Sequence, residues 1–189
     1  MSHITWISPY LDIVLDEVPL DAKKILEVGC GYGIFGFILK KTRRDATVEG
    51  IEPFDYSLGH YDKLYKMDWK TFFKDNEYDY NVIICNETVE HMEKCDALDF
   101  LDQAKSIAPK VIVGTPYQFD QQDAYDGNPY QVHKCVITEK DFHKKGYITK
   151  RLGFSKNGIR YYHEPSIQSR LLRVTPMNII AVYNKLNSY

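Results

Sequence analysis

Several features that define other classes of protein are missing from this sequence. Its cysteines (Cys30, Cys85, Cys95 and Cys135) form no C-x-x-C pair, so we expect reduced thiols of an intracellular protein rather than a disulfide framework. No apolar run approaches the ~20 residues that span a membrane, and the N-terminus lacks the basic and apolar segments of a signal peptide. A net charge of −2 excludes a surface that is basic throughout and suited to nucleic acid. These absences predict a cytoplasmic protein with no membrane partner.

The alternation of apolar segments predicts the fold class. The chain has 189 residues, 44% of them hydrophobic, and no repeat or low-complexity segment divides it, which fits one globular domain with a substantial core. We expect a single domain over residues 1–189 of the α/β class, with a doubly wound, Rossmann-like, seven-stranded sheet that is mostly parallel and has a C-terminal antiparallel strand. The expected strands cover residues 25–28, 47–51, 64–67, 79–85, 110–114, 147–152 and 178–182.

A glycine-rich turn follows the first expected strand. The stretch reads Glu27-Val-Gly-Cys-Gly-Tyr-Gly33 and then enters an apolar segment of helical period. Glycines suit a sharp strand-to-helix turn where the backbone approaches a ligand closely, and the helix N-terminus offers unpaired N–H groups there. The dinucleotide fingerprint would need a glycine at position 34, which is Ile34. A carboxylate beside the turn favours a ligand with cationic groups instead.

This stretch resembles motif I of the class I S-adenosylmethionine (SAM) methyltransferases. The resemblance implies SAM as cofactor, with Gly29, Gly31 and Gly33 admitting it and Glu27 facing its amino-acid end. Glu52 ends the second strand 19 residues after Gly33, the spacing at which an acidic side chain meets ribose hydroxyls. By the same resemblance Asp68 binds the adenine amino group and Trp69 stacks on the ring or belongs to the core. Asn86, after the fourth strand, completes the expected cofactor set.

A carboxylate and histidine cluster follows the fourth strand. Glu87, Glu90 and His91 stand at i, i+3 and i+4, which predicts one face of a helix beside the transferable methyl group. The Glu-x-x-Glu-His pattern is similar to quinone-biosynthesis O-methyltransferases and to small-RNA 2′-O-methyltransferases. The latter add a histidine after a Thr-Pro strand end, and here His133 follows Thr115-Pro116.

This cluster has two candidate roles, the first implied by the resemblance to the RNA branch and the second by the pKa of imidazole, which lies near operating pH. Glu87, Glu90, His91 and His133 would ligate a divalent metal that acidifies an acceptor hydroxyl. Without a metal, His91 or His133 would act as a general base, so we take Glu87, His91 and His133 as the candidate catalytic residues. The alternative is that the pattern only caps a helix and closes the cofactor pocket.

Two features of the sequence bear on the methyl acceptor. Residues 143–173 hold eight Lys or Arg against one acid, which favours an anionic acceptor or a nucleic-acid contact, although solvated surface explains the same bias. The segment Asn128-Pro-Tyr130 is similar to one in glycan-cluster methyltransferases. We therefore expect methyl transfer to an oxygen of a small-molecule or glycan-type anionic acceptor. Two alternatives stay open: a metal-dependent RNA 2′-O-methyltransferase, and a catalytically silent SAM-fold regulatory subunit.

Overall fold

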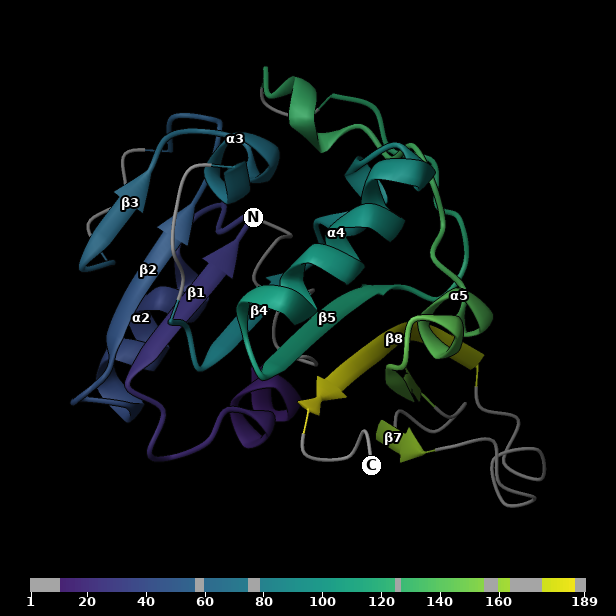
Figure 1. Cartoon of the computed structure of the whole chain (residues 1–189). Coiled ribbons are helices and arrows are strands. Elements are labelled where there is room, and N and C mark those ends of the chain that lie inside the picture. The colour runs from purple at the N-terminus through teal and green to yellow at the C-terminus, as the bar shows by residue number, and fades with distance from the viewer. Residues whose placement is uncertain are drawn as a thin grey trace.

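A single mixed sheet organises the molecule (Figure 1). The structure is a computed structural model that describes residues 11–56, 60–74, 79–124, 127–154, 160–163 and 175–185. Within these residues the sheet has eight strands in the order β3-β2-β1-β4-β5-β8-β6-β7. The strands are β1 (Lys24–Val28), β2 (Thr47–Ile51), β3 (Lys63–Tyr65), β4 (Val82–Asn86), β5 (Lys110–Pro116), β6 (Ile148–Phe154), β7 (Arg160–His163) and β8 (Thr175–Asn184).

Five neighbouring strands, β3-β2-β1-β4-β5, run parallel. β8 pairs antiparallel with β5, β6 with β8, and β7 with β6. The predicted fold class, a doubly wound and mostly parallel sheet that ends antiparallel, is confirmed. All seven expected strands are present. The eighth strand, β7, lies between β6 and β8 in the chain and forms the edge of the sheet next to β6.

Helices cover both faces of the sheet. They are α2 (Ile34–Thr42), α3 (Trp69–Lys74), α4 (Lys94–Ile107) and α5 (Glu139–Lys144), with two short 3₁₀ turns, η1 (Val89–His91) and η2 (Pro129–Gln131). Residues 11–17 are also helical. The helix at 11–17 and α2 pack on one face of the sheet, while α3, α4 and α5 pack on the other.

β4 shows how the sequence builds two cores at once. Ile83 and Cys85 face the core under α4, whereas Val82 and Ile84 face the core under α2, and all four are fully buried. Successive side chains of a strand point to opposite faces, so a central strand with helices on both sides must be apolar throughout. This explains the continuous apolar run at this point of the sequence.

The strand order reverses between β1 and β4. Ligands of open α/β sheets bind outside the carboxyl ends of the strands at such a reversal. The glycine turn after β1 and the Glu87–His91 segment after β4 both lie there. Within the described residues, no helix combines the length and apolarity needed to cross a bilayer.

Candidate active site

A cavity of about 870 Å³ opens at the carboxyl ends of β1, β2, β4 and β5. Eleven of the twelve residues predicted for the site line it: Glu27, Gly29, Gly31, Glu52, Asp68, Trp69, Asn86, Glu87, Glu90, His91 and His133. Gly33 is buried and does not line the cavity. The volume is typical of clefts that enclose a small organic ligand.

The glycine turn needs its glycines for backbone reasons. Gly29, Gly31 and Gly33 have φ angles of 71°, 46° and 73°, in the left-handed region where a side chain is strained. Gly33 stands at the N-cap of α2, so its role is to start the helix. A Cβ on Gly31 would meet nothing within 4 Å, which leaves the cleft open on this side.

Glu52 ties the acidic end of β2 to the glycine turn. One of its carboxylate oxygens accepts a 2.9 Å hydrogen bond from the N–H of Gly31, and the other accepts one of 3.0 Å from the N–H of Phe54. A carboxylate has about four acceptor positions, so both oxygens keep capacity for a ligand's hydroxyl groups. Burial raises the pKa of Glu52.

Glu27 is the buried carboxyl at the end of β1, and Tyr61 is its partner. The Tyr61 hydroxyl donates a 2.8 Å hydrogen bond to Oε2 of Glu27. Burial raises the pKa of Glu27 to about 8, even though this hydrogen bond favours the ionised form. No sequence motif pointed to Tyr61. Its place depends on the small residues Gly36 and Gly50, which leave room for its ring.

Asp68 and Trp69, the residues predicted to contact adenine, also have structural roles. Asp68 caps α3 by accepting hydrogen bonds from the N–H and the hydroxyl of Thr71, at 2.9 and 3.0 Å. Trp69 is only 7% exposed and packs edge-on against Phe73 and Phe100. Trp69 therefore belongs mainly to the core, although it also contributes to the lining of the cleft.

The segment after β4 is not the helix that the sequence spacing predicted. Glu87 has a φ of 49°, η1 comprises only Val89–His91, and α4 begins at Lys94. The prediction that Glu87 shares a helical face with Glu90 and His91 is therefore wrong. The N–H of Glu87 donates to the carbonyl of Gly114 on β5 at 2.9 Å, which holds the chain in the left-handed conformation that turns it out of the sheet.

Two buried acceptors in this segment have no hydrogen-bond partner. They are Oδ1 of Asn86 and Oε1 of Glu90. The other oxygen of Glu90 accepts a 3.1 Å hydrogen bond from the Thr115 hydroxyl, and burial raises the pKa of Glu90 to about 7. An unpaired buried acceptor is costly, so both atoms are suited to a donor or a cation supplied by a ligand.

Glu90, His91 and His133 form a compact group of possible ligands. One side-chain ligand atom from each lies within 4.8 Å of the other two, and the two imidazole rings have centroids 4.8 Å apart. Burial, followed by the charge of His133, lowers the pKa of His91 to about 4.

Glu87, the fourth expected ligand, is not in this group. Its Oε1 accepts a 3.5 Å hydrogen bond from the Asn178 amide, and burial together with Glu90 raises its pKa well above the usual range.

Both histidines have one ring nitrogen against a backbone carbonyl. Nδ1 of His91 lies 3.3 Å from the Val132 oxygen, and Nδ1 of His133 lies 2.6 Å from the Asp120 oxygen. A carbonyl oxygen only accepts, so in the neutral form of each ring it is Nδ1 that carries the proton. Nε2 is then the nitrogen with a free lone pair, as a metal ligand or a base requires.

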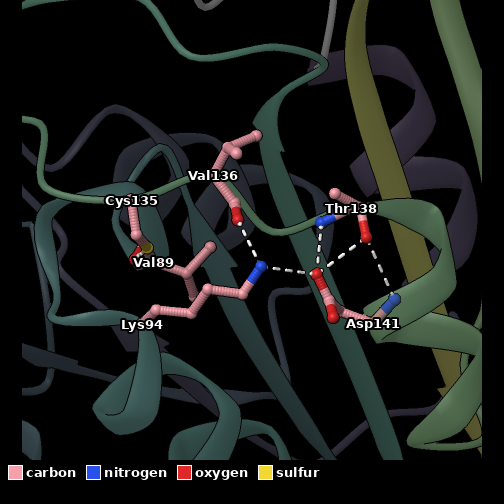
Figure 2. A network of polar contacts seen from close by, with 6 residues as sticks. All are labelled: Val89, Lys94, Cys135, Val136, Thr138 and Asp141. Carbon is pink, nitrogen blue, oxygen red and sulfur yellow. Dashed lines mark hydrogen bonds and ion pairs between the residues drawn. The ribbon is translucent and has the colours of Figure 1, made fainter.

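His133 is brought to η1 by the chain around it. The N–H groups of Lys134 and Cys135 both donate to the carbonyl of Glu90, at 2.8 and 3.2 Å. Figure 2 shows how Lys94 at the start of α4 fixes the next residues: its ammonium donates to the Val136 carbonyl at 3.1 Å and to Asp141 at 2.9 Å.

Asp141 in turn belongs to the N-terminus of α5. Thr138 and Asp141 form a capping box at this helix, with each side chain accepting from the other's N–H. The capped helix therefore anchors the segment that carries His133.

The basic segment 143–173 does not contribute to the cleft as far as its side chains are described. Four of its bases are described: Lys144, Lys145, Lys150 and Arg151. None of them lines the cleft, and the last three form ion pairs with Asp102, Glu17 and Glu139. The other four bases lie outside the described side chains. The expectation of an anionic acceptor therefore gains no support from this segment.

Comparison with known proteins identifies the family. A family model described as a methyltransferase domain matches residues 7–154, and no curated protein matches. The chain belongs to this methyltransferase-domain family, and its enzyme class is that of the SAM-dependent methyltransferases.

Solved structures share the fold at low sequence identity. A SAM-dependent methyltransferase from Archaeoglobus fulgidus is 13% identical with a TM-score of 0.65, covering 94% of this chain and 92% of that one. The methyltransferase domain of bacterial CtHen1-CN is 18% identical with a TM-score of 0.58, covering 94% and 98%. Magnesium protoporphyrin IX methyltransferase from Synechocystis PCC 6803, solved with bound SAM, is 16% identical with a TM-score of 0.56, covering 96% and 80%.

Proposed function

We propose that this protein transfers a methyl group from SAM to a hydroxyl oxygen of a small-molecule acceptor. The observation that carries the proposal is the group formed by Glu90, His91 and His133 in the lining of the cleft, where one side-chain ligand atom of each residue lies within 4.8 Å of the other two. Acidifying or deprotonating a hydroxyl requires groups of this kind.

The cofactor takes the part of the cleft between β1 and β2. Glu27 faces its amino-acid end, Glu52 accepts from the ribose hydroxyls, and Asp68 binds the adenine amino group. The unpartnered Oδ1 of Asn86 supplies one more acceptor. Gly29 and Gly31 let the ligand approach the backbone, while Gly33 serves by starting α2.

The chemical step needs little covalent participation by the protein. SAM supplies a methyl group on a sulfonium, which is already a good leaving group. A lone pair of the acceptor oxygen forms the new bond to the methyl carbon, the carbon–sulfur bond breaks, and its electron pair stays on sulfur. Nε2 of His133 takes the hydroxyl proton and passes it to solvent. The protein contributes alignment and this proton transfer.

The same three residues fit a divalent metal. Two neutral imidazoles and one carboxylate suit manganese, iron, cobalt or zinc better than magnesium, and Oε1 of Glu90 is buried without a hydrogen-bond partner. A bound cation would lower the pKa of the acceptor hydroxyl. This metal set has three protein ligands, without Glu87.

RNA 2′-O-methylation would use the same group but needs phosphate contacts as well. Only two lysines line the described cleft, and both are paired: Lys70 with Asp96 at 2.6 Å and Lys134 with Glu93 at 3.8 Å. The described cleft therefore favours a small molecule.

The decisive test is methyl transfer by variants of one histidine. Labelled SAM is incubated with a pooled set of hydroxylated aromatics, sugars and nucleosides, and methylated products are located by mass spectrometry. We expect O-methylation by the wild type, and a loss of about 100-fold or more in His133→Asn with unchanged affinity for S-adenosylhomocysteine (SAH). His143→Asn is the matched control, because His143 bonds Thr149 away from the cleft. Full activity of His133→Asn, or methylation only at nitrogen or carbon, contradicts the proposal.

A further inference from the structure

We infer that the acceptor is an uncharged, planar ring compound that carries the reacting hydroxyl. This inference rests on the proposed function and adds the class of substrate. It follows from two independent properties of the cleft: which apolar side chains stay exposed there, and which charged side chains line it.

Exposed apolar side chains gather at the cleft. Among the described residues, seven large hydrophobic side chains remain exposed. Four of them line the cleft: Tyr32, Phe119, Tyr130 and Met177, with exposed fractions of 49%, 53%, 51% and 38%. Isolated exposed hydrophobic residues need no explanation, but several around one concave site indicate a surface that a ligand covers.

Phe119 and Tyr130 belong to the segments that fix the two histidines. Phe119 directly precedes Asp120, whose carbonyl holds Nδ1 of His133. Tyr130 lies two residues before Val132, whose carbonyl holds Nδ1 of His91. Both aromatic residues line the same cavity as the two histidines, so a ring bound against them lies in the cavity that holds the proposed proton acceptor.

Amide groups join the segment that contains Phe119 and Gln122 to the segment that contains Tyr130 and His133. Nε2 of Gln122 donates a 2.7 Å hydrogen bond to the carbonyl of Gln131, and the N–H of His133 donates to the carbonyl of Gln122 at 3.0 Å. Met177 closes the same side from β8, where its carbonyl accepts from the N–H of Tyr117 at 2.7 Å. The polar groups that accompany the aromatic side chains here include uncharged amides, which suit an uncharged ligand.

The charge of the cleft disfavours an anion. Eight carboxyl side chains line the described cleft. Burial raises the pKa of four of them, Glu27, Glu52, Glu87 and Glu90, and the other four are Asp68, Glu93, Asp96 and Asp120. Against them stand only Lys70 and Lys134, each already in an ion pair. A phosphate or carboxylate on the acceptor would meet like charge without a free cation in the described cleft, which costs affinity.

Two matched probes test this inference. 2-Naphthol and 6-hydroxy-2-naphthoate share the ring and the hydroxyl and differ by one remote carboxylate. Their binding to the SAH-loaded protein is measured by calorimetry, and their methylation by SAM is followed as SAH release. We expect saturable binding and methylation of 2-naphthol, with the naphthoate at least about tenfold weaker because of like-charge repulsion.

Variants connect the binding to the named side chains. Phe119→Leu and Tyr130→Leu should each weaken 2-naphthol binding about three- to tenfold, since each removes one aromatic contact. Phe37→Leu is the matched control, because Phe37 is equally exposed (47%) but lies on α2 outside the cleft, and it should change nothing.

Equal or tighter binding of the naphthoate overturns the inference, as does tighter binding of a short oligoribonucleotide or a neutral methyl glucoside. The same holds if neither leucine variant weakens 2-naphthol binding or if the control weakens it as much. SAH binding separates this outcome from failure of the proposed function. A protein that binds SAH but not 2-naphthol refutes the acceptor class alone, whereas a protein that does not bind SAH refutes the proposed function itself.

Discussion

Tyr61 donates its hydroxyl hydrogen to Oε2 of Glu27 across 2.8 Å, linking the loop before β3 to the buried end of β1. The Tyr61 ring is packed so closely that a Cβ on Gly36 would lie 2.4 Å from it, and one on Gly50 would lie 3.1 Å away. Two glycines on different elements thus give the ring its place. The position of the carboxyl expected to face the cofactor therefore depends on a residue outside every recognised motif.

Tyr61→Phe should weaken SAH binding while leaving the fold intact. The ring still fills its place, but Glu27 loses its hydrogen-bond donor, so we expect about a tenfold higher dissociation constant, the effect of one hydrogen bond to a charged group. Calorimetric titration with SAH measures it. Tyr80→Phe is the control, because the Tyr80 hydroxyl donates to buried Glu49 outside the cleft. Equal effects of the two variants on SAH affinity would contradict a specific role for Tyr61.

SAH affinity should rise with pH up to about pH 8. Burial raises the pKa of Glu27 to about 8 from 4.5, while Tyr61, Cys30 and Glu52 are the titratable groups that face it. Glu27 therefore keeps its proton at lower pH and gains the charge that attracts an ammonium group as pH rises toward 8. Calorimetry from about pH 6 to about pH 8 tests this. Glu27→Gln should flatten the profile, and a flat wild-type profile would contradict the assignment.

Without ligand, the Glu27 carboxyl should make the folded protein less stable as pH rises, whereas it should make SAH binding tighter. Between about pH 4.5 and pH 8 the unfolded chain has lost the Glu27 proton that the folded protein keeps, so this group's contribution to the free energy of unfolding falls as pH rises. The melting temperature of Glu27→Gln should therefore decline less across this range than that of the wild type. An equal decline would show that the carboxyl is not protonated when buried.

Gly29→Ala and Gly31→Ala should separate stability from binding. Both glycines have positive φ, which costs roughly 1–2 kcal/mol for alanine. At Gly29 the new Cβ would also lie 2.3 Å from the Thr88 hydroxyl oxygen, whereas at Gly31 it faces open space. Gly29→Ala should therefore lower the melting temperature more. Gly31→Ala should stay folded and lose SAH affinity, because its methyl group occupies the cleft. The reverse ranking in thermal melts would contradict this geometry.

The fold could be predicted from sequence because strand and helix periods, glycine turns and apolar runs are local signals. β4 shows this: a strand was expected over residues 79–85 and lies at Val82–Asn86. Where the prediction was wrong, a contact between residues far apart in the sequence determined the backbone conformation. The spacing of Glu87, Glu90 and His91 is helical, yet the hydrogen bond from the Glu87 N–H to Gly114 holds a left-handed turn instead.

Site residues that belong to a sequence motif could be predicted. Site residues that only tertiary packing brings to the cleft could not. Glu52 and the glycines follow from spacing and residue type. The Tyr61 contact requires two distant glycines, and Asn178 reaches Glu87 through the register of β8 against β5, which pairs it with Pro116. The sequence contains no local signal for such contacts. The anionic acceptor expected from the charge bias of residues 143–173 stays a prediction, because the described bases of this segment do not line the cleft and three of them form ion pairs away from it.

The cofactor assignment is tested most directly by the melting temperature with and without SAH, in wild type and in Glu52→Ala. SAH at about a hundred times its dissociation constant should stabilise the wild type by ~2.7 kcal/mol, or roughly 5 to 10 °C for a chain of this size. Glu52→Ala should fold and show no shift at that concentration. A wild type whose melting temperature does not move at saturating SAH would contradict the account, and would favour a protein that keeps this fold in a regulatory role without catalysis.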